Sequence, residues 1–442
     1  MSDKFAIQTG GLIMSNQRLV VHGDFIFTPK PGEVVVHEDA YASIAKGRVE
    51  AVSDTCPSIG PDVDYTDYAG KLIIPGFADV HLHAVQYVTR GLGYDKELLP
   101  WLDDYTFPEE ANFKDHAYGQ KVFRDLVHDL WSAGTLHCAI YSSLHADAAL
   151  SLMELFAKAG LSAYVGKVNM DRNSVEALTE TTEESIRETM RYLKSSQEYA
   201  AYDVWPILTP RFAPSCSDEL MHWLGERAQE DGLPVQSHVN ENRGEIAWVK
   251  ELFPQSRDYL SVYDDFKLLP QGRTIMAHCI HNTEAEMKMF ADKDVLIAHC
   301  PDSNGNLASG IMPAGKMIDS GLRVGLGSDI GGGNRLFMGY AVESAMKMSR
   351  LLWAQSDHAH RTLTFAEAFH MATAGGGSFF GQTGAFLPGY SFDALVIDDS
   401  RMRKYRPLSI FERLQKFVFT GDDRNIVARY RGGQVLEEPV LD

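Results

Sequence analysis

The chain has 442 residues, and its 41 lysines and arginines against 60 aspartates and glutamates leave a formal charge of −19 at pH 7. Hydrophobic residues make up 45% of the chain and charged residues 23%, a composition typical of a folded globular protein rather than a disordered one. Because a negative surface repels nucleic-acid phosphates and anionic lipids, this charge disfavours both as partners and favours a small neutral or cationic ligand.

The N-terminal region carries no pattern of membrane targeting. No stretch approaches the roughly 18 consecutive apolar residues of a membrane helix, and the opening residues lack the layout of a signal peptide. We therefore expect a cytoplasmic protein, with Met14 as an alternative start that would make residues 1–13 an extension. The five cysteines have no Cys-x-x-Cys spacing, which favours free thiols over a disulfide framework.

Both ends of the chain have the pattern of short β-strands. Residues 15–70 and 385–442 are rich in β-branched residues and turn residues, as expected of small antiparallel strands. The simplest arrangement is one domain that takes strands from both ends. We therefore predict a composite β-sandwich domain formed by residues 1–72 and 385–442.

Between these ends, short apolar runs alternate with amphipathic helical patterns, such as those over 116–134, 147–160 and 182–197. Apolar strands that alternate with helices indicate a parallel sheet buried on both faces. Eight such runs predict that residues 73–384 form an α/β fold, a closed (β/α)8 TIM barrel. The runs are 72–83, 135–143, 162–170, 203–212, 234–242, 274–281, 295–304 and 323–333.

An unusually long connection follows the first apolar run. Residues 84–115 contain several aromatic residues and end in WLDDYTFPEE. A long loop at the catalytic end of a barrel commonly acts as a lid or a specificity element. We expect this role for the connection.

Polar residues gather where the apolar runs end, which is where a barrel carries its active site. One buried histidine is more often a hydrogen-bonded core residue than a ligand, so the functional reading depends on several of them lying at the same end. Most other histidines, among them His137 and His145, are expected to be structural. The candidates are His81, His83, Arg211, His238, Glu241, His278, His281 and Asp329.

Four of these candidates predict a metal site. His81 and His83 are separated by one residue, so alternation along a strand points both imidazoles to the same face. His238 from the fifth run and Asp329 from the eighth complete a mixed nitrogen and oxygen set. Such a set suits one Zn²⁺, with Fe²⁺ as the alternative, and leaves a position for water.

Several motifs resemble a known family. PGFADVHLH, SHVNEN, MAHCIH, AHCPDSN and GLGSD resemble the amidohydrolase superfamily of metal-dependent hydrolases. Within it, HLHAVQY, LLPWLDDYTFPEE, TPRFAPSC, SHVNENRGEI and FTGDDRNI resemble the guanine deaminase family, over about residues 70–425. The resemblance implies a homodimeric enzyme of purine catabolism and salvage that hydrolyses guanine to xanthine and ammonia.

The chemistry of such a deamination assigns roles to three residues. The reaction requires activated water and protons for the ring and the leaving ammonia, and zinc lowers the pKa of bound water to about 7. Asp329 is the expected general base as well as a ligand. Glu241, three residues after His238, is the expected proton shuttle, although a solvated loop carboxylate is the plain alternative. His278 is expected to orient the nucleophile and to stabilise developing charge.

Substrate recognition is assigned to residues beside the metal ligands. A guanidinium has only donors, so Arg211 at a strand end requires an acceptor, and guanine offers O6 and N7 where adenine presents an amino group. A salt bridge to a helix carboxylate is the structural alternative for Arg211. Gln86 is expected to bind another edge of the ring, and Phe212 to stack on it. The predicted substrate contacts are His83, Gln86, Arg211, Phe212, His238, Glu241 and Asp329.

Two other functions remain open at this point. One keeps the chemistry but changes the substrate to another aminated purine, a pterin, a triazine or a pyrimidine. The other is a non-catalytic scaffold that has lost its metal ligands. Against it stand the intact site residues His81, His83, His238, Glu241, His278 and Asp329.

Overall fold

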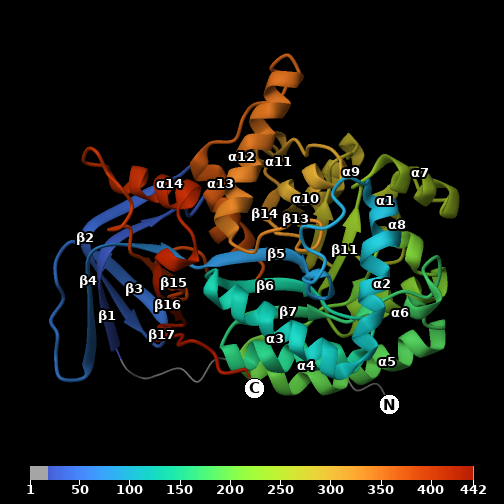
Figure 1. The fold of residues 1–442 in the computed structure, drawn as a ribbon, viewed down its shortest axis with the longest axis horizontal. Coiled ribbons are helices and arrows are strands. Elements are labelled where there is room, and N and C mark those ends of the chain that lie inside the picture. The colour runs from blue at the N-terminus through green and yellow to red at the C-terminus, as the bar shows by residue number, and fades with distance from the viewer. Residues whose placement is uncertain (1–17, 442) are drawn as a thin grey trace.

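The computed structural model describes residues 18–441. The alternative start at Met14, and the part of the predicted β domain that precedes Arg18, lie outside the described residues. Figure 1 shows a larger body of strands and helices with a smaller β sheet at one end. This smaller sheet combines the first four strands of the described chain with the last three.

The smaller sheet has seven strands in the order β17-β16-β15-β4-β1-β2-β3. Most neighbours are antiparallel, as predicted, but β1 and β4 are parallel, because the chain crosses from the β3 edge to the other side of β1 before it forms β4. The strands are β1 (Arg18–Phe27), β2 (Val35–Ala45), β3 (Arg48–Ser53), β4 (Val63–Pro75), β15 (Ala394–Ile397), β16 (Ile426–Arg431) and β17 (Gln434–Val435).

The C-terminal flank also contains a helix that was not predicted. Helix α14 (Ile410–Thr420) begins with a capping box between Ser409 and Glu412, and buries Leu414 and Phe417. It lies against β1, β2 and β4. The flank was predicted as strands alone because an eleven-residue amphipathic helix contributes little to the composition of a β-rich segment.

The larger body contains two four-stranded parallel sheets, in the orders β5-β6-β7-β9 and β11-β12-β13-β14, and the short parallel pair β8 and β10. Leu208 bridges to Val235, and the backbone N–H of Asp329 donates to the carbonyl of His81, so contacts run between the two sheets. The strands are β5 (Phe77–His83), β6 (Thr135–Tyr141), β7 (Ser162–Gly166), β8 (Val168–Asn169), β9 (Val204–Pro206), β10 (Thr209–Pro210), β11 (Val235–Val239), β12 (Thr274–His278), β13 (Leu296–His299) and β14 (Arg323–Leu326).

Each predicted apolar run contains a strand of these sheets, but several runs are broken. The run over 203–212 divides into β9 and β10, where Pro206 and Pro210 lack the N–H that a ladder requires. The first run divides at Gly76, between β4 and β5, where an added Cβ would lie 2.3 Å from Leu136. Strand β4 therefore extends to Pro75, beyond the predicted boundary at residue 72.

Most helices of the larger body begin with a side-chain cap. The capping boxes of α5, α9 and α13 each pair a threonine with a glutamate three residues later. The helices are α3 (His116–Ser132), α4 (Ala146–Ala159), α5 (Thr182–Ser195), α6 (Asp218–Glu230), α7 (Arg243–Leu252), α8 (Tyr259–Asp265), α9 (Glu284–Asp292), α10 (Pro301–Asn306), α11 (Ala314–Asp319), α12 (Met338–Gln355) and α13 (Phe365–His370). The first three match the predicted segments to within two residues.

The long connection after β5 is mostly helical. It contains η1 (Ala84–Gln86), α1 (Leu98–Trp101), η2 (Leu102–Thr106), α2 (Phe107–Glu110) and η3 (Ala111–Lys114). We call residues 98–114 the cover segment. Leu98 and Trp101 are buried against Leu307, and the Trp101 indole donates to the carbonyl of Leu92 at 2.9 Å. The segment is therefore a packed part of the molecule rather than an open loop.

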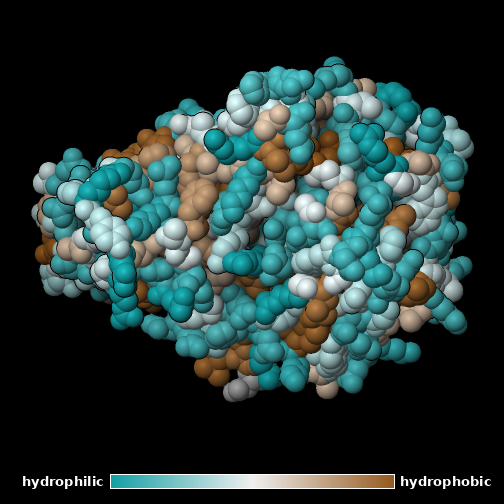
Figure 2. All heavy atoms as spheres, turned by 45° about the horizontal axis from the view of Figure 1, so that its top comes forward, coloured by the Kyte–Doolittle hydropathy of each residue, from teal (hydrophilic) through white to brown (hydrophobic). Residues whose placement is uncertain are grey.

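The face drawn in Figure 2 is largely hydrophilic, with apolar side chains in small separate patches. None of the helices within residues 18–441 combines the length and the apolar character needed to cross a membrane.

Candidate active site

Three buried imidazoles meet at the carboxyl ends of β5 and β11. His81 and His83 lie on one face of β5, as the alternation predicts, and His238 lies near the end of β11. The Nε2 atoms of His83 and His238 are 3.2 Å apart. Burial, together with the nearby His81, lowers the pKa of both rings well below the usual value. These imidazoles are therefore neutral, which is the form that binds a metal.

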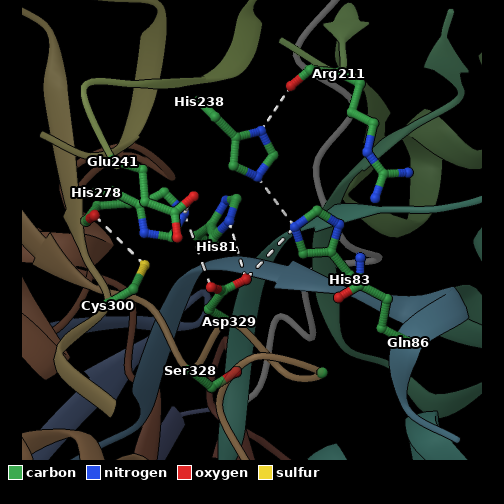
Figure 3. Close-up of polar contacts among 12 residues, drawn as sticks. His81, His83, Gln86, Arg211, His238, Glu241, His278, Cys300, Ser328 and Asp329 are labelled. Atoms are coloured by element: carbon green, nitrogen blue, oxygen red, sulfur yellow. Dashed lines mark hydrogen bonds and ion pairs between the residues drawn. The ribbon is translucent and has the colours of Figure 1, made fainter. Parts of the chain in front are cut away.

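Asp329, in the loop after β14, completes this cluster (Figure 3). Its Oδ1 lies 3.2 Å from Nε2 of His81 and 3.5 Å from Nε2 of His83. Burial opposes ionisation of the carboxyl, but His81 and the other nearby imidazoles outweigh this effect and lower the pKa of Asp329 well below the usual value. An anionic oxygen donor thus faces neutral nitrogen donors.

The cluster has the donor set of a metal site. The predicted ligands His81, His83, His238 and Asp329 all lie within it, and a mixed nitrogen and oxygen set suits Zn²⁺. Cys300, a buried free cysteine, also lies at its edge. Three overlapping groups place their ligand atoms within 4.8 Å of one another: His81, His83 and Asp329; His81, His238 and His278; and His278, Cys300 and Asp329.

Glu241 and His278 face each other beside the cluster. Nε2 of His278 lies 3.4 Å from Oε2 of Glu241 and 3.8 Å from Oδ2 of Asp329. Burial raises the pKa of Glu241 to about 7, so this carboxyl is suited to gain and lose a proton near neutral pH. Burial would lower the pKa of His278, yet the carboxylates of Glu241 and Asp329 raise it.

Unusual backbone conformations coincide with these side chains. Asn240, His278 and Asp329 have φ values of 55°, 70° and 47°, in the left-handed region that residues other than glycine rarely adopt. Such conformations cost about 1–3 kcal/mol each and persist only where surrounding contacts enforce them. They turn the chain sharply at the strand ends, which explains why the predicted runs extend past the observed strands.

Hydrogen bonds from neighbouring segments orient the central side chains. Nδ1 of His238 donates to the carbonyl oxygen of Arg211 at 2.6 Å, which directs Nε2 toward the cluster. Nδ1 of His278 donates to Oδ1 of Asn304 at 2.8 Å, which directs Nε2 toward Glu241. The hydroxyl of Ser309 donates to Oε1 of Glu241 at 3.0 Å.

A second buried carboxyl, Asp79, supports the backbone behind the cluster. Its Oδ1 accepts from the backbone N–H groups of Ser328 at 2.9 Å and His81 at 3.3 Å. Burial raises the pKa of Asp79 to about 7. The sequence analysis placed Asp79 within the motif PGFADVHLH but assigned it no role.

A pocket opens beside the cluster, and the cover segment forms part of its wall. The predicted substrate contacts Gln86, Arg211 and Phe212 line it, and Phe212 packs edge-on against Trp248 with ring centroids 6.0 Å apart. The other lining residues are His83, Leu98, Trp101, Leu102, His238, Glu241, Glu245, His278, Leu307, Asp329 and Gly332. A ligand in this pocket would therefore contact both the cluster and the cover segment.

Glu110 from α2 meets the acceptor requirement of Arg211. Its Oε2 accepts from Nη1 of Arg211 at 2.5 Å, and its Oε1 accepts from Nη2 at 2.9 Å. Oε1 also accepts from Nε2 of Gln86 at 3.0 Å. The salt bridge to a helix carboxylate, considered from the sequence as the alternative for Arg211, is thus present, and Arg211 also lines the pocket.

The sequence analysis missed Glu110, Asn304 and Ser309, and it grouped His281 with the strand-end candidates. Nε2 of His281 instead donates to the carbonyl of Ser309 at 2.9 Å, so His281 supports the loop that holds Glu241. Asn304 lies in the motif AHCPDSN and Glu110 ends WLDDYTFPEE, so both residues belong to motifs that the sequence analysis had singled out. Which of their polar residues are buried beside the site depends on the fold.

Comparison with known proteins finds related sequences over most of the chain. A model of the amidohydrolase family matches residues 72–436. Guanine deaminase from Dictyostelium discoideum is 40% identical over 378 residues, which cover 84% of each chain. The human guanine deaminase is 37% identical over 378 residues, which cover 82% of each chain.

A solved structure is similar over nearly the whole length. Guanine deaminase from C. acetobutylicum, with guanine bound in its active site, superposes with a TM-score of 0.90 at 42% sequence identity. The match covers 95% of this chain and 100% of that chain.

Proposed function

The chain belongs to the amidohydrolase family, and we propose that it catalyses the hydrolytic deamination of guanine to xanthine and ammonia. The observation that carries the proposal is the set of neutral imidazoles around an ionised Asp329, next to a pocket that Arg211 and Gln86 line. Relatives named guanine deaminase at 37–42% identity support the substrate.

The donor set fits one divalent metal ion, which we propose is Zn²⁺ with His81, His83, His238 and Asp329 as ligands. Both ring nitrogens of His81 are buried without a hydrogen-bond partner among the described residues, and a metal would satisfy one of them. Nε2 of His83 and Nε2 of His238, which lie 3.2 Å apart, would both be available as ligand atoms. When bound, the ion would supply Lewis-acid activation of water near neutral pH.

The protein groups would carry the protons of the reaction. Attack of a water oxygen on C2 of guanine requires Asp329 or Glu241 to accept a proton. Glu241, with its pKa raised to about 7, would pass a proton to the ring nitrogen and then to the amine, which leaves as ammonia. His278 lies within 4 Å of both carboxylates, at 3.4 Å and 3.8 Å, and would stabilise the negative charge on the oxygen that becomes attached to C2.

Substrate binding would use the donors that Glu110 leaves free. A guanidinium has five N–H groups, and Glu110 accepts from two nitrogens, so Arg211 retains donors for a ring carbonyl. Phe212 and the apolar residues Leu98 and Trp101 would contact the faces of the ring. Leaving such a donor unpaired costs about 1–3 kcal/mol, so a purine without the carbonyl would bind less well.

A substrate panel tests the proposal. Metal-replete protein should release ammonia from guanine at least a hundredfold faster than from adenine, cytosine, a pterin or an aminotriazine, a margin of about 3 kcal/mol in transition-state binding. Ultraviolet absorbance and an ammonia assay would follow each reaction, with metal content measured in parallel. Equal or reversed rates would overturn guanine as the substrate.

Membership of the amidohydrolase family also supports a proposal for the overall architecture. We propose that β5 to β14 form one closed (β/α)8 barrel over residues 73–384, with a composite β-sandwich domain from 1–72 and 385–442. The hydrogen bond from Asp329 to His81 supports closure between β14 and β5. The homodimer and the cytoplasmic location stay predictions, which light scattering and cell fractionation would test.

A further inference from the structure

Glu110 joins two pocket residues that come from distant parts of the sequence. Gln86 follows strand β5 and Arg211 follows strand β10, yet both side chains donate to the same buried carboxylate. Glu110 does not itself belong to the pocket wall as the described residues form it, whereas both of its partners do. It therefore lies behind the groups that a ligand would meet.

The pairing determines which atoms Gln86 and Arg211 can offer. Because a carboxylate only accepts, Gln86 must turn its amide nitrogen toward Glu110, and the amide oxygen remains as an acceptor. That oxygen lies so close to Gly331 that an added Cβ there would be 2.3 Å away, so the amide is held at both ends. Arg211 is held in a two-point pair that fixes the plane of its guanidinium.

The cover segment contacts Arg211 from a second direction. Phe107 lies on α2, three residues before Glu110, and its ring centroid is 5.2 Å from Cζ of Arg211. Phe107 packs into a buried cluster with Tyr141 and Met170, which anchors the short helix to the body of the protein. The position of Arg211 therefore depends on α2 as well as on its own strand.

We propose that Glu110 is a positioning residue for substrate selection, which aligns the donors of Arg211 and the acceptor of Gln86 with the purine edge. This inference rests on the proposed deamination of guanine. The main-chain carbonyl of Arg211 orients His238 separately, so the alignment of substrate and the support of the metal site use different atoms of one residue.

The test compares Glu110→Gln with the matched control Glu109→Gln. Both changes remove one negative charge from α2, but Glu109 accepts from the hydroxyl of Tyr118 and forms no hydrogen bond or ion pair with Gln86 or Arg211 within residues 18–441. Metal-loaded proteins would be assayed with guanine and with 2-aminopurine, which lacks the ring carbonyl. Metal content and thermal melting would be measured for each variant.

We expect Glu110→Gln to raise the KM for guanine about tenfold or more, with a smaller change in kcat and unchanged metal content. The preference for guanine over 2-aminopurine should fall by a similar factor, because only guanine uses the aligned donors. Glu109→Gln should match the wild type. A loss of kcat for both substrates with an unchanged preference would overturn the inference and make Glu110 a structural residue.

Two further outcomes distinguish a failure of the positioning role from a failure of the proposed function. If Glu110→Gln does not fold, Glu110→Asp keeps the charge but withdraws the carboxylate by one methylene, and it should show the same fall in preference to a smaller degree. An unchanged preference in this folded variant would contradict the positioning role. A wild-type protein that fails to deaminate guanine would instead contradict the proposed function.

Discussion

Two regions of this molecule bury a histidine against an aspartate, and they arrange the pair in opposite ways. At the junction between strand β6 and the seven-stranded sheet, Asp393 accepts from His137 at 3.0 Å, from Thr383 at 2.6 Å, and from Ser391 and the backbone of Gly432 at 2.7 Å each. At the strand ends, Oδ1 of Asp329 lies 3.2 Å from His81 and 3.5 Å from His83, and burial lowers the pKa of both imidazoles.

The difference separates a structural pair from a functional one. Asp393 has a donor for each oxygen, so the junction is complete without any other component. In the cluster at Asp329, the ring nitrogens of His81 have no hydrogen-bond partner within residues 18–441, and a bound cation would complete the set of nitrogen and oxygen ligand atoms. Both regions contain a buried histidine beside a buried aspartate, so the hydrogen bonds that these residues form are what distinguishes the two regions.

The largest expected effect comes from exchanging the central carboxylate for an amide. Asp329→Asn should lose bound metal and at least about a thousandfold in kcat/KM, because it removes an anionic ligand and the proposed base together. Metal analysis and steady-state assays would measure both. Asp393→Asn, the same exchange at the junction, should keep its metal, and retention of metal and activity in Asp329→Asn would contradict the assignment.

The next effect separates proton transfer from metal binding. Glu241→Gln should retain metal but lose about a hundredfold or more in kcat, because an amide cannot shuttle protons while it still accepts from Ser309. Single-turnover kinetics with metal analysis would check this. A variant with near-normal turnover would exclude Glu241 as the shuttle.

At the junction, substitution of Asp393 should change the stability of the protein rather than its catalytic activity. Asp393→Asn should lower the free energy of unfolding by about 3 kcal/mol, since it removes a buried carboxylate that accepts from His137, Thr383, Ser391 and Gly432. Urea unfolding would measure the loss, and kcat per folded molecule should stay near the wild-type value. A variant of normal stability would show that the junction contributes little to folding.

The sequence predicts the strand-end cluster well because local rules determine it. Alternation places His81 and His83 on one face, and parallel strands bring their carboxyl ends to one side, so His238 and Asp329 could be assigned from the order of the runs. The family resemblance, now supported by a match over residues 72–436, adds the reaction.

The remaining features depend on the path of the chain in three dimensions. Glu110 was not predicted because its pairing with Arg211 joins residues 101 positions apart through the fold of the cover segment. The parallel pairing of β1 with β4 depends on a crossover that no local pattern encodes. Asp393 lies in the C-terminal flank, which the sequence analysis predicted as strands alone. Its role is visible only in the fold, where His137 of β6 donates to it.

The smallest effect is a pH dependence confined to the junction. Burial would raise the pKa of Asp393, but the bond and charge of His137 outweigh it, so the folded pKa lies below the usual 3.8. The stability from this group is therefore present above about pH 4 and is lost as the pH falls toward the folded value. The gap in unfolding free energy between wild type and Asp393→Asn should narrow by about 1 kcal/mol from pH 4 to pH 3. Urea unfolding at pH 6, 4 and 3 would measure it, and a constant gap would mean that lost hydrogen bonds, rather than charge, account for the destabilisation.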